Sequence, residues 1–116
     1  TKQECYMTSL AEKKTRAALK SSFDRAVATS NKQTLVILDS LNYIKGFRYE
    51  LHCISKAAGE RHGILWILNR ASVVEEWNSN RIDKERQGYS RELLLELIQR
   101  YEPPDERNRW DKPMYA

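Results

Sequence analysis

The sequence is poor in the features that define several protein classes. Its two cysteines, Cys5 and Cys53, lack CxxC or HxxxH neighbours, so reduced thiols are favoured over a disulfide framework or a zinc site. The longest apolar runs, 35–38 and 64–68, are far too short to cross a bilayer, and we expect no membrane partner. The HExxH motif of zinc proteases is absent too. These absences argue against a disulfide-rich, zinc-dependent or membrane-spanning protein.

A phosphate-binding loop of the form GxxxxGK[ST] is missing as well. Such a loop holds phosphates on its backbone amides, and its closely spaced glycines let the backbone approach them. The four glycines of this chain are scattered instead, at Gly46, Gly59, Gly63 and Gly88. Because the chain begins at Thr1 rather than at a methionine, we expect further sequence upstream of it.

The amino-acid composition is that of an ordinary folded protein. With 41% hydrophobic and 31% charged residues, the chain is not expected to be disordered. Its 116 residues make one domain at most, or part of one. The 20 Lys and Arg against 16 Asp and Glu give a net charge of +4, which permits a nucleic-acid partner without requiring one.

Hydrophobic spacing predicts helices that alternate with strands, followed by an extended tail. Two runs are apolar throughout, which is typical of strands buried on both faces of a parallel sheet, and helices over such a sheet define the α/β class. Two strands are too few for this sheet, so the chain is expected to be part of a larger domain. The expected elements are helices at Ser9–Ala28, Lys45–Ala58, Ser72–Trp77 and from Ser90 towards Pro103, and strands at Thr34–Leu38 and Ile64–Leu68.

Signals at the helix ends support these boundaries. Ser9 and Ser72 each stand three residues before a glutamate, which is the spacing of a capping box. Gly59 follows the second helix, where a left-handed residue is favoured, and Ser90 is expected to cap the last helix. Residues 78–88 are polar and charged and are expected to be mobile.

Asp39 is the first residue with a candidate chemical role. It directly follows the apolar run 34–38, and ligands of open α/β sheets bind at the carboxyl ends of the strands. A carboxylate there holds magnesium, usually through water, opposite the phosphates of a nucleotide. The alternative is that the strand ends in Asp39 only because aspartate starts turns.

The segment after Asp39 suits a tight turn into the next helix. Asn42 and Gly46 are turn residues, and Arg48 stands about one helical turn further on. The planar guanidinium of Arg48 could reach back to a phosphate with two parallel hydrogen bonds. The alternative is an ordinary exposed ion pair between Arg48 and Glu50, which would contribute little to stability.

The tail 107–113 carries two arginines and a tryptophan without helical spacing. Ordering such side chains costs conformational entropy unless they dock on something. Trp110 is expected to pack within its own domain, and stacking on a nucleic-acid base is the alternative. Arg109 either stabilises phosphate charge or pairs with Asp111.

Two long stretches resemble a known family. Residues 38–51 and 101–113 are similar to the two signatures typical of the killer-toxin-insensitivity protein family, the Elongator-associated P-loop ATPases. The resemblance implies a three-layer, kinase-type P-loop NTPase fold with a parallel sheet. It also implies that residues 1–116 are part of a single domain, from the magnesium-side (Walker B) strand to the tail, without the phosphate-loop (Walker A) strand and its loop.

The same resemblance implies a function. Members of this family are expected to bind tRNA, to hydrolyse ATP with Mg²⁺ when tRNA stimulates them, and to support Elongator in modifying wobble uridines. Elongator and tRNA would therefore be the partners, in the cytoplasm and nucleus. Two alternatives stay open, namely a kinase of seryl-tRNA and a non-catalytic interaction module that has lost its nucleotide site.

Residue roles follow from the matching positions. Asp39 matches the Walker B aspartate, and it is the expected metal ligand. The resemblance implies Asp39, Arg48 and Arg109 as catalytic residues, with the two arginines near the phosphates and Trp110 bracing the tail against the sheet. Cofactor binding is expected at Ser40, Asn42, Arg107, Asn108 and Trp110.

The missing loop limits what this chain is expected to do alone. Without a phosphate cradle, we do not expect it to hydrolyse ATP by itself. In a kinase-type sheet the Walker A strand lies between the Walker B strand and the next one. The segments 34–38 and 64–68 are therefore not expected to be neighbours, unless they pair directly in the absence of the central strand.

Overall fold

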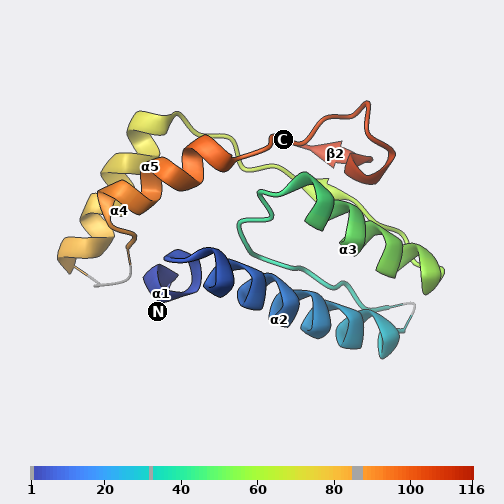
Figure 1. Cartoon of the computed structure of the whole chain (residues 1–116). Coiled ribbons are helices and arrows are strands. Elements are labelled where there is room, and N and C mark those ends of the chain that lie inside the picture. The colour runs from blue at the N-terminus through green and yellow to red at the C-terminus, as the bar shows by residue number, and fades with distance from the viewer. Residues whose placement is uncertain (1, 32, 85–87) are drawn as a thin grey trace. The chain divides into compact units, whose positions relative to one another are not determined.

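The computed structural model describes residues 2–31, 33–84 and 88–116 (Figure 1). The chain divides into two compact units. The first comprises residues 1–15 and 67–101, and the second comprises residues 16–66 and 102–116. Helix α2 (Ser9–Ala28) contributes its first residues to one unit and the remainder to the other. The single-domain prediction for residues 1–116 stays a prediction.

The first unit consists of helices. Helices α4 (Ala71–Lys84) and α5 (Arg91–Arg100) lie side by side (Figure 1). Helix α5 buries Leu93, Leu94 and Leu97. Asn78 of α4 holds Tyr89, just before α5, because its side chain donates to the Tyr89 carbonyl oxygen at 2.7 Å and accepts from the Tyr89 amide at 2.8 Å. The elements of this unit are α1 (Lys2–Tyr6), the start of α2, α4 (Ala71–Lys84) and α5 (Arg91–Arg100).

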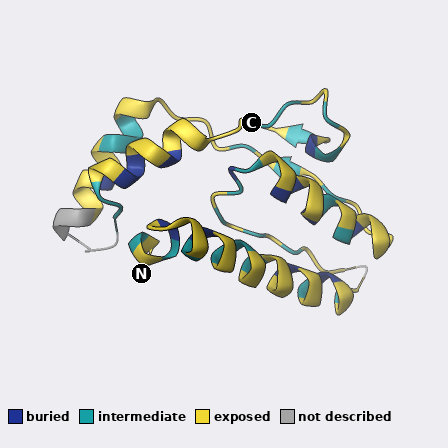
Figure 2. Cartoon of the chain, viewed as in Figure 1, coloured by how far each residue is buried: buried dark blue, intermediate teal, exposed yellow. Residues whose placement is uncertain are grey.

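The second unit holds a small core between α2 and α3. Phe23 and Val27 of α2 meet Phe47 and Leu51 of α3 (Lys45–Ala57) in one buried cluster. Figure 2 marks buried residues on both of these helices. Burying such side chains contributes roughly 1.5–3 kcal/mol each. The elements here are the rest of α2, α3 (Lys45–Ala57), β1 (Ile64–Leu65), the 3-10 turn η1 (Arg109–Asp111) and β2 (Met114–Tyr115).

Several expected boundaries are confirmed. Helix α2 begins and ends as predicted, and α3 ends within one residue of the expected position. Gly59 has a φ of +72°, in the left-handed region where glycine is favoured. The Ser90 hydroxyl oxygen accepts a hydrogen bond from the Leu93 amide at 3.3 Å, which confirms the cap of α5.

Two expected caps are wrong. At the start of α2, the amide of Ala11 donates to the hydroxyl of Thr8 rather than Ser9, at 3.0 Å. Glu12 accepts a hydrogen bond from Arg100 of α5 at 2.7 Å. Helix α4 already starts at Ala71, so Ser72 lies inside its first turn.

Helix α4 is longer than predicted. It was expected to end near Trp77, yet it continues to Lys84. Residues 78–84 contain neither proline nor glycine, so nothing in them stops a helix once it is nucleated. Of the remaining residues that were expected to be mobile, 85–87 lie outside the described residues.

The predicted strand Thr34–Leu38 is absent from the described structure, and its burial on both faces is wrong. Val36 and Leu38 pack against the α2–α3 core, but Leu35 and Ile37 are 82% and 77% exposed. One face is thus covered by helices and the other is open. A strand needs a hydrogen-bonded neighbour, and the described residues give this segment none.

The second predicted strand is shortened and finds an unexpected partner. Of residues 64–68, only Ile64–Leu65 form β1, which pairs in parallel with β2. The tail, expected to be merely extended, supplies that neighbouring strand. Within the described residues β1 and segment 34–38 do not pair, so the alternative of direct pairing is wrong.

Candidate functional site

The turn that carries Asp39 is closed by the side chain of Asn42. Asp39 is exposed and Ser40 is half-buried. Asn42 has a φ of +45°, which asparagine tolerates better than most residues, and its Nδ2 donates to the Leu38 carbonyl oxygen at 3.2 Å. The turn therefore presents the Asp39 carboxylate to solvent directly after the extended segment.

The tail fixes the junction between this turn and α3. The amide of Glu102 donates to the Tyr43 carbonyl oxygen at 2.9 Å. The carboxylate of Glu102 then accepts from the Lys45 amide at 3.2 Å. A carboxylate at this place satisfies one of the free amides in the first turn and complements the positive end of the helix dipole.

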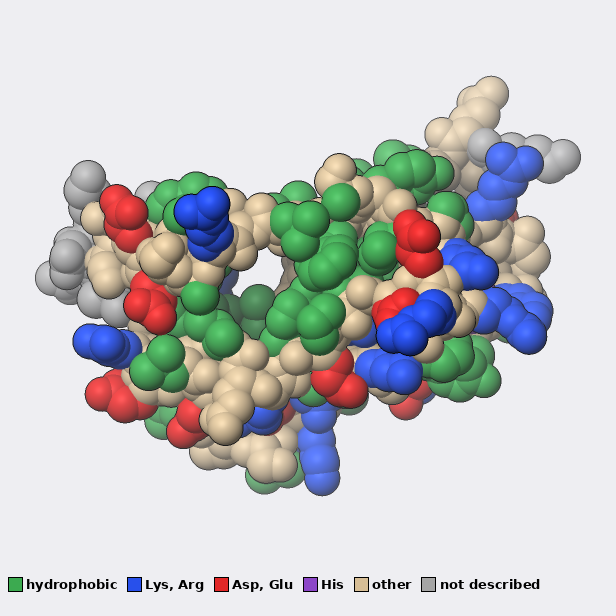
Figure 3. Space-filling model, turned by 90° about the horizontal axis from the view of Figure 1, so that it is seen from above, with side chains coloured by type: hydrophobic (Ala, Val, Ile, Leu, Met, Phe, Trp, Pro, Cys, Tyr) green, Lys and Arg blue, Asp and Glu red, His purple; other side chains and the backbone are tan. Residues whose placement is uncertain are grey.

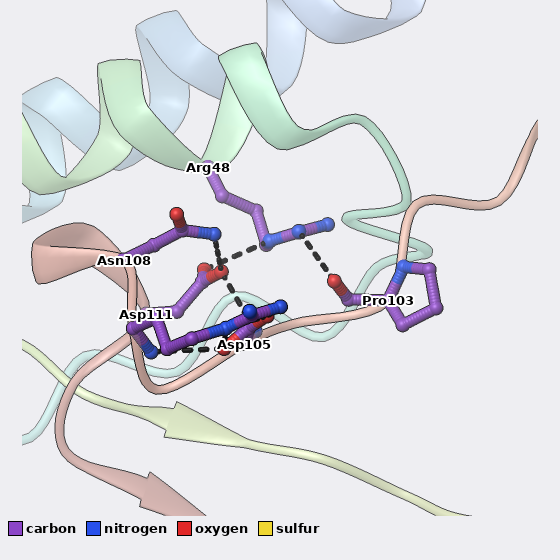
Figure 4. Close-up of polar contacts among 6 residues, drawn as sticks. Arg48, Pro103, Asp105, Asn108 and Asp111 are labelled. Carbon is purple, nitrogen blue, oxygen red and sulfur yellow. Dashed lines mark hydrogen bonds and ion pairs between the residues drawn. The ribbon is translucent and has the colours of Figure 1, made fainter.

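Arg48 is the centre of the polar contacts between α3 and the tail (Figure 4). Its side chain is 4% exposed, and its Nε lies 3.0 Å from Oδ1 of Asp111, whose side chain is fully buried. The other guanidinium nitrogens donate to backbone carbonyls, Nη1 to Asn42 at 2.9 Å and Nη2 to Pro103 at 3.4 Å. All three nitrogens thus have acceptors inside the second unit.

Asp111 is equally well satisfied. Its Oδ2 accepts from the amide of Asp105 at 3.1 Å and from Nδ2 of Asn108 at 3.2 Å. A buried ion pair offsets its desolvation cost only when further hydrogen bonds satisfy both partners, which is the arrangement seen here. Asp111 had been expected only as an alternative partner of Arg109, although a buried arginine requires an acid nearby.

These contacts decide between the alternatives for Arg48 and Arg109. Arg48 is not in an exposed pair with Glu50, because Glu50 lies 3.5 Å from Lys20 instead. Arg109 does not pair with Asp111, because Arg48 occupies that carboxylate. Arg109 is exposed, and its predicted phosphate contact, like that of Arg48, stays a prediction.

Trp110 packs on α3. Its ring meets Tyr49 edge-to-face with centroids 5.2 Å apart, and the ammonium of Lys45 lies 5.6 Å from the ring centroid. Packing within its own unit is therefore confirmed, but the observed partner belongs to α3, whereas a sheet partner was expected. An edge-to-face pair is favourable because the ring edge is positive and the ring face negative.

A second ion pair lies in the same tail, on its surface. Arg107 is 90% exposed, and it pairs with Asp105 through Nε and Nη2. The hydrogen bonds from Arg107 lower the pKa of Asp105 to about 2. Of the predicted site residues, the structure thus places Asn108 at the buried pair and Arg107 at the exposed one.

Lys/Arg and Asp/Glu side chains are interspersed on the face shown in Figure 3. This mixture agrees with the modest net charge of +4 and favours a solvated surface over a concentrated basic patch. A groove of about 550 Å³ runs between α2 and α3, lined in part by Lys20, Asp24 and Cys53. It does not include Asp39, and we assign no site to it.

The predicted metal ligand, Asp39, is an exposed carboxylate. Among the described side chains of residues 2–31, 33–81 and 88–116, no three His, Cys, Asp or Glu gather into a metal cluster. Magnesium binds through one or two carboxylates together with water and substrate phosphates, and Asp39 is the residue that would hold it here. No described helix is long and apolar enough to span a membrane.

Comparison with known proteins identifies close relatives. The sequence profile of the family described as "Chromatin associated protein KTI12" matches residues 1–116. The chain is 46% identical to a KTI12 homologue from Danio rerio over 115 residues and 42% identical to one from Arabidopsis thaliana over 110 residues. It is 41% identical to Protein KTI12 from Saccharomyces cerevisiae over 115 residues.

These matches cover most of this chain but a minor part of the relatives. They span 99%, 95% and 99% of the chain, against 40%, 35% and 35% of the Danio rerio, Arabidopsis thaliana and Saccharomyces cerevisiae proteins. The chain therefore spans well under half the length of the curated relatives that it matches.

A solved structure matches the fold. Kti12 from Chaetomium thermophilum, crystallised in complex with ADP-AlF3, superposes with a TM-score of 0.81 at 36% identity. The match covers 90% of this chain and 56% of that one. The predicted fold class is thereby confirmed, since the chain has part of a P-loop NTPase fold.

Proposed function

The chain belongs to the KTI12 family, and we propose that it supplies the magnesium side of a nucleotide site in a P-loop ATPase. The observation that carries this proposal is the exposed Asp39, on a turn fixed by Asn42 directly after the extended segment. The likeness to a Kti12 crystallised with ADP-AlF3 supports ATP as the nucleotide.

In this proposal, the chain's own residues bind the metal ion and counter the phosphate charge. Magnesium, when bound, neutralises charge on the nucleotide phosphates. Asp39 would hold that ion, directly or through water, while Asn42 keeps the turn in the conformation that exposes the carboxylate. Arg109 is exposed and would counter phosphate charge. The phosphate cradle itself would come from sequence outside this chain.

We further propose that the whole protein binds tRNA and supports Elongator in wobble-uridine modification, in the cytoplasm and nucleus. The resemblance of residues 38–51 and 101–113 to the family signatures supports this. The net charge of +4 is compatible with an RNA partner.

The experiment is a titration of the intact protein with ATP, with and without tRNA, for the parent and for Asp39→Ala. Loss of a metal-orienting carboxylate is expected to reduce tRNA-stimulated turnover by about 100-fold or more, equivalent to roughly 2.7 kcal/mol of transition-state stabilisation. Asp24→Ala is the matched control, because Asp24 is an exposed carboxylate on α2.

Undiminished turnover of Asp39→Ala would refute the Walker B assignment. The fate of a labelled γ-phosphate separates the remaining possibilities. Release as inorganic phosphate supports an ATPase, transfer to tRNA indicates a kinase, and no nucleotide binding by the parent indicates an interaction module.

A further inference from the structure

We propose that Arg48 and Asp111 form a positioning pair that couples the tail to the Asp39 turn. This inference rests on the proposed nucleotide site, but it assigns Arg48 a role other than direct phosphate contact. It also assigns a positioning role to Asp111, which the sequence indicated only as an alternative partner of Arg109.

A short chain of hydrogen bonds leads from the tail to the turn. Asp111 Oδ1 accepts from Arg48 Nε at 3.0 Å, and Arg48 Nη1 donates to the Asn42 carbonyl oxygen at 2.9 Å. The side chain of Asn42 in turn holds the carbonyl of Leu38, the residue before Asp39, at 3.2 Å. Displacing Asp111 would thus loosen the residue that closes the turn.

The burial of the pair explains why Arg48 is fixed in this role. Arg48 is 3% exposed and Asp111 is 0% exposed, so neither charge has water as a substitute partner. Turning Arg48 towards a phosphate would leave Asp111 buried without its cation, which is strongly unfavourable. Arg109 is exposed and carries no such commitment to Asp111, which leaves it as the arginine for phosphate contact.

A second contact from the tail reaches the same junction. Glu102 binds the backbone of Tyr43 and of Lys45, on either side of the start of α3. The tail therefore holds the turn–helix junction at two points, through Glu102 and through Asp111. A change in the path of the tail would be transmitted to the Asp39 carboxylate.

The test uses the intact protein with Asp111→Asn and Arg48→Lys. Asp111→Asn removes the charge that holds Arg48, and Arg48→Lys keeps a cation for Asp111 but loses the planar fork that also reaches Asn42. Asp105→Asn is the matched control, because it keeps the backbone amide that donates to Asp111 and changes only a carboxylate that pairs with the exposed Arg107. ADP serves as the probe, with Mg²⁺ and with EDTA.

Two readouts separate positioning from direct contact. We expect backbone amides of residues 39–44 to exchange hydrogen about tenfold faster in both variants than in the control, since the turn opens more often. We expect a rise of about tenfold in the Mg²⁺ concentration at which the effect of Mg²⁺ on ADP binding is half-maximal. Such a loss of metal affinity is typical of changes in residues that orient a metal ligand without touching the metal. ADP affinity in EDTA should stay within about twofold, since neither residue touches the nucleotide.

Three outcomes would overturn the proposal. Weaker ADP binding in EDTA for Arg48→Lys alone would indicate a direct phosphate contact. Unchanged hydrogen exchange at residues 39–44 in both folded variants would refute the coupling. If neither variant folds, the pair contributes to stability only, and the positioning role is refuted. If only Asp111→Asn fails to fold, the hydrogen exchange of Arg48→Lys decides between the outcomes.

Failure of the proposed function would look different. A parent protein that binds no nucleotide would refute the nucleotide site, whereas the hydrogen-exchange comparison would still decide whether the pair holds the turn.

Discussion

Two aspartates of the tail form Arg–Asp pairs of the same chemistry in opposite environments. Asp111 pairs with Arg48 across 63 residues of sequence, and both side chains are at most 4% exposed. Asp105 pairs with Arg107, two residues away, and the arginine is 90% exposed. Identical ion-pair partners therefore contribute differently to stability. Losing one partner of a buried pair destabilises the fold far more than losing one partner of an exposed pair.

The largest expected effect comes from breaking the buried pair. Asp111→Ala leaves Arg48 charged and without its carboxylate, so we expect a loss of about 3–5 kcal/mol in the free energy of unfolding. Chemical denaturation of the intact protein measures it. The double variant Arg48→Met with Asp111→Leu removes both charges, and it should lose less than Asp111→Ala alone. A greater loss in the double variant would contradict this account.

A smaller effect is expected at the exposed pair. Arg107→Ala removes a contact that water and salt already screen, so the denaturation midpoint should fall only slightly, far less than in Asp111→Ala. The measurement is repeated at low and high salt, since any remaining contribution of the pair to stability should disappear at high salt. A clear loss that salt does not alter would mean that this pair is not merely a surface contact.

The smallest effect is expected in acid. The pKa of Asp105 is lowered from 3.8 to about 2 in the folded chain, so its contribution to stability is present above pH 3.8 and is lost as the pH falls towards 2. The parent should therefore show a slightly steeper loss of stability than Asp105→Asn between about pH 4 and pH 2. Identical slopes in this window would show that the pair is not formed in solution.

Helices α2, α3 and α5 were predictable because their signals are local, whereas α1 was not predicted and α4 was predicted too short. The faces of α2 and α3 follow from hydrophobic spacing, and Ser90 and Gly59 mark helix ends by their own backbone chemistry. The exposed Asp39 turn was predictable for the same reason, since a short apolar run followed by aspartate and asparagine is a local pattern.

The pairings between distant segments were not predictable in this way. No periodicity links Arg48 to Asp111. An arginine in a predicted helix fits an exposed position as well as a buried one until its partner is known. The same limit applies to β1, whose neighbour β2 is contributed by the tail. Segment 34–38 was predicted from composition alone, which does not reveal whether a neighbouring strand is present.

That segment has a consequence for handling the protein. Leu35 and Ile37 project from an extended, β-branched stretch that has no strand partner among the described residues. Such an open edge is a template on which other chains add strands, as in aggregation. Expressed by itself, the chain will therefore tend to precipitate as its concentration rises, and charged replacements at Leu35 and Ile37 are the direct means of keeping it in solution.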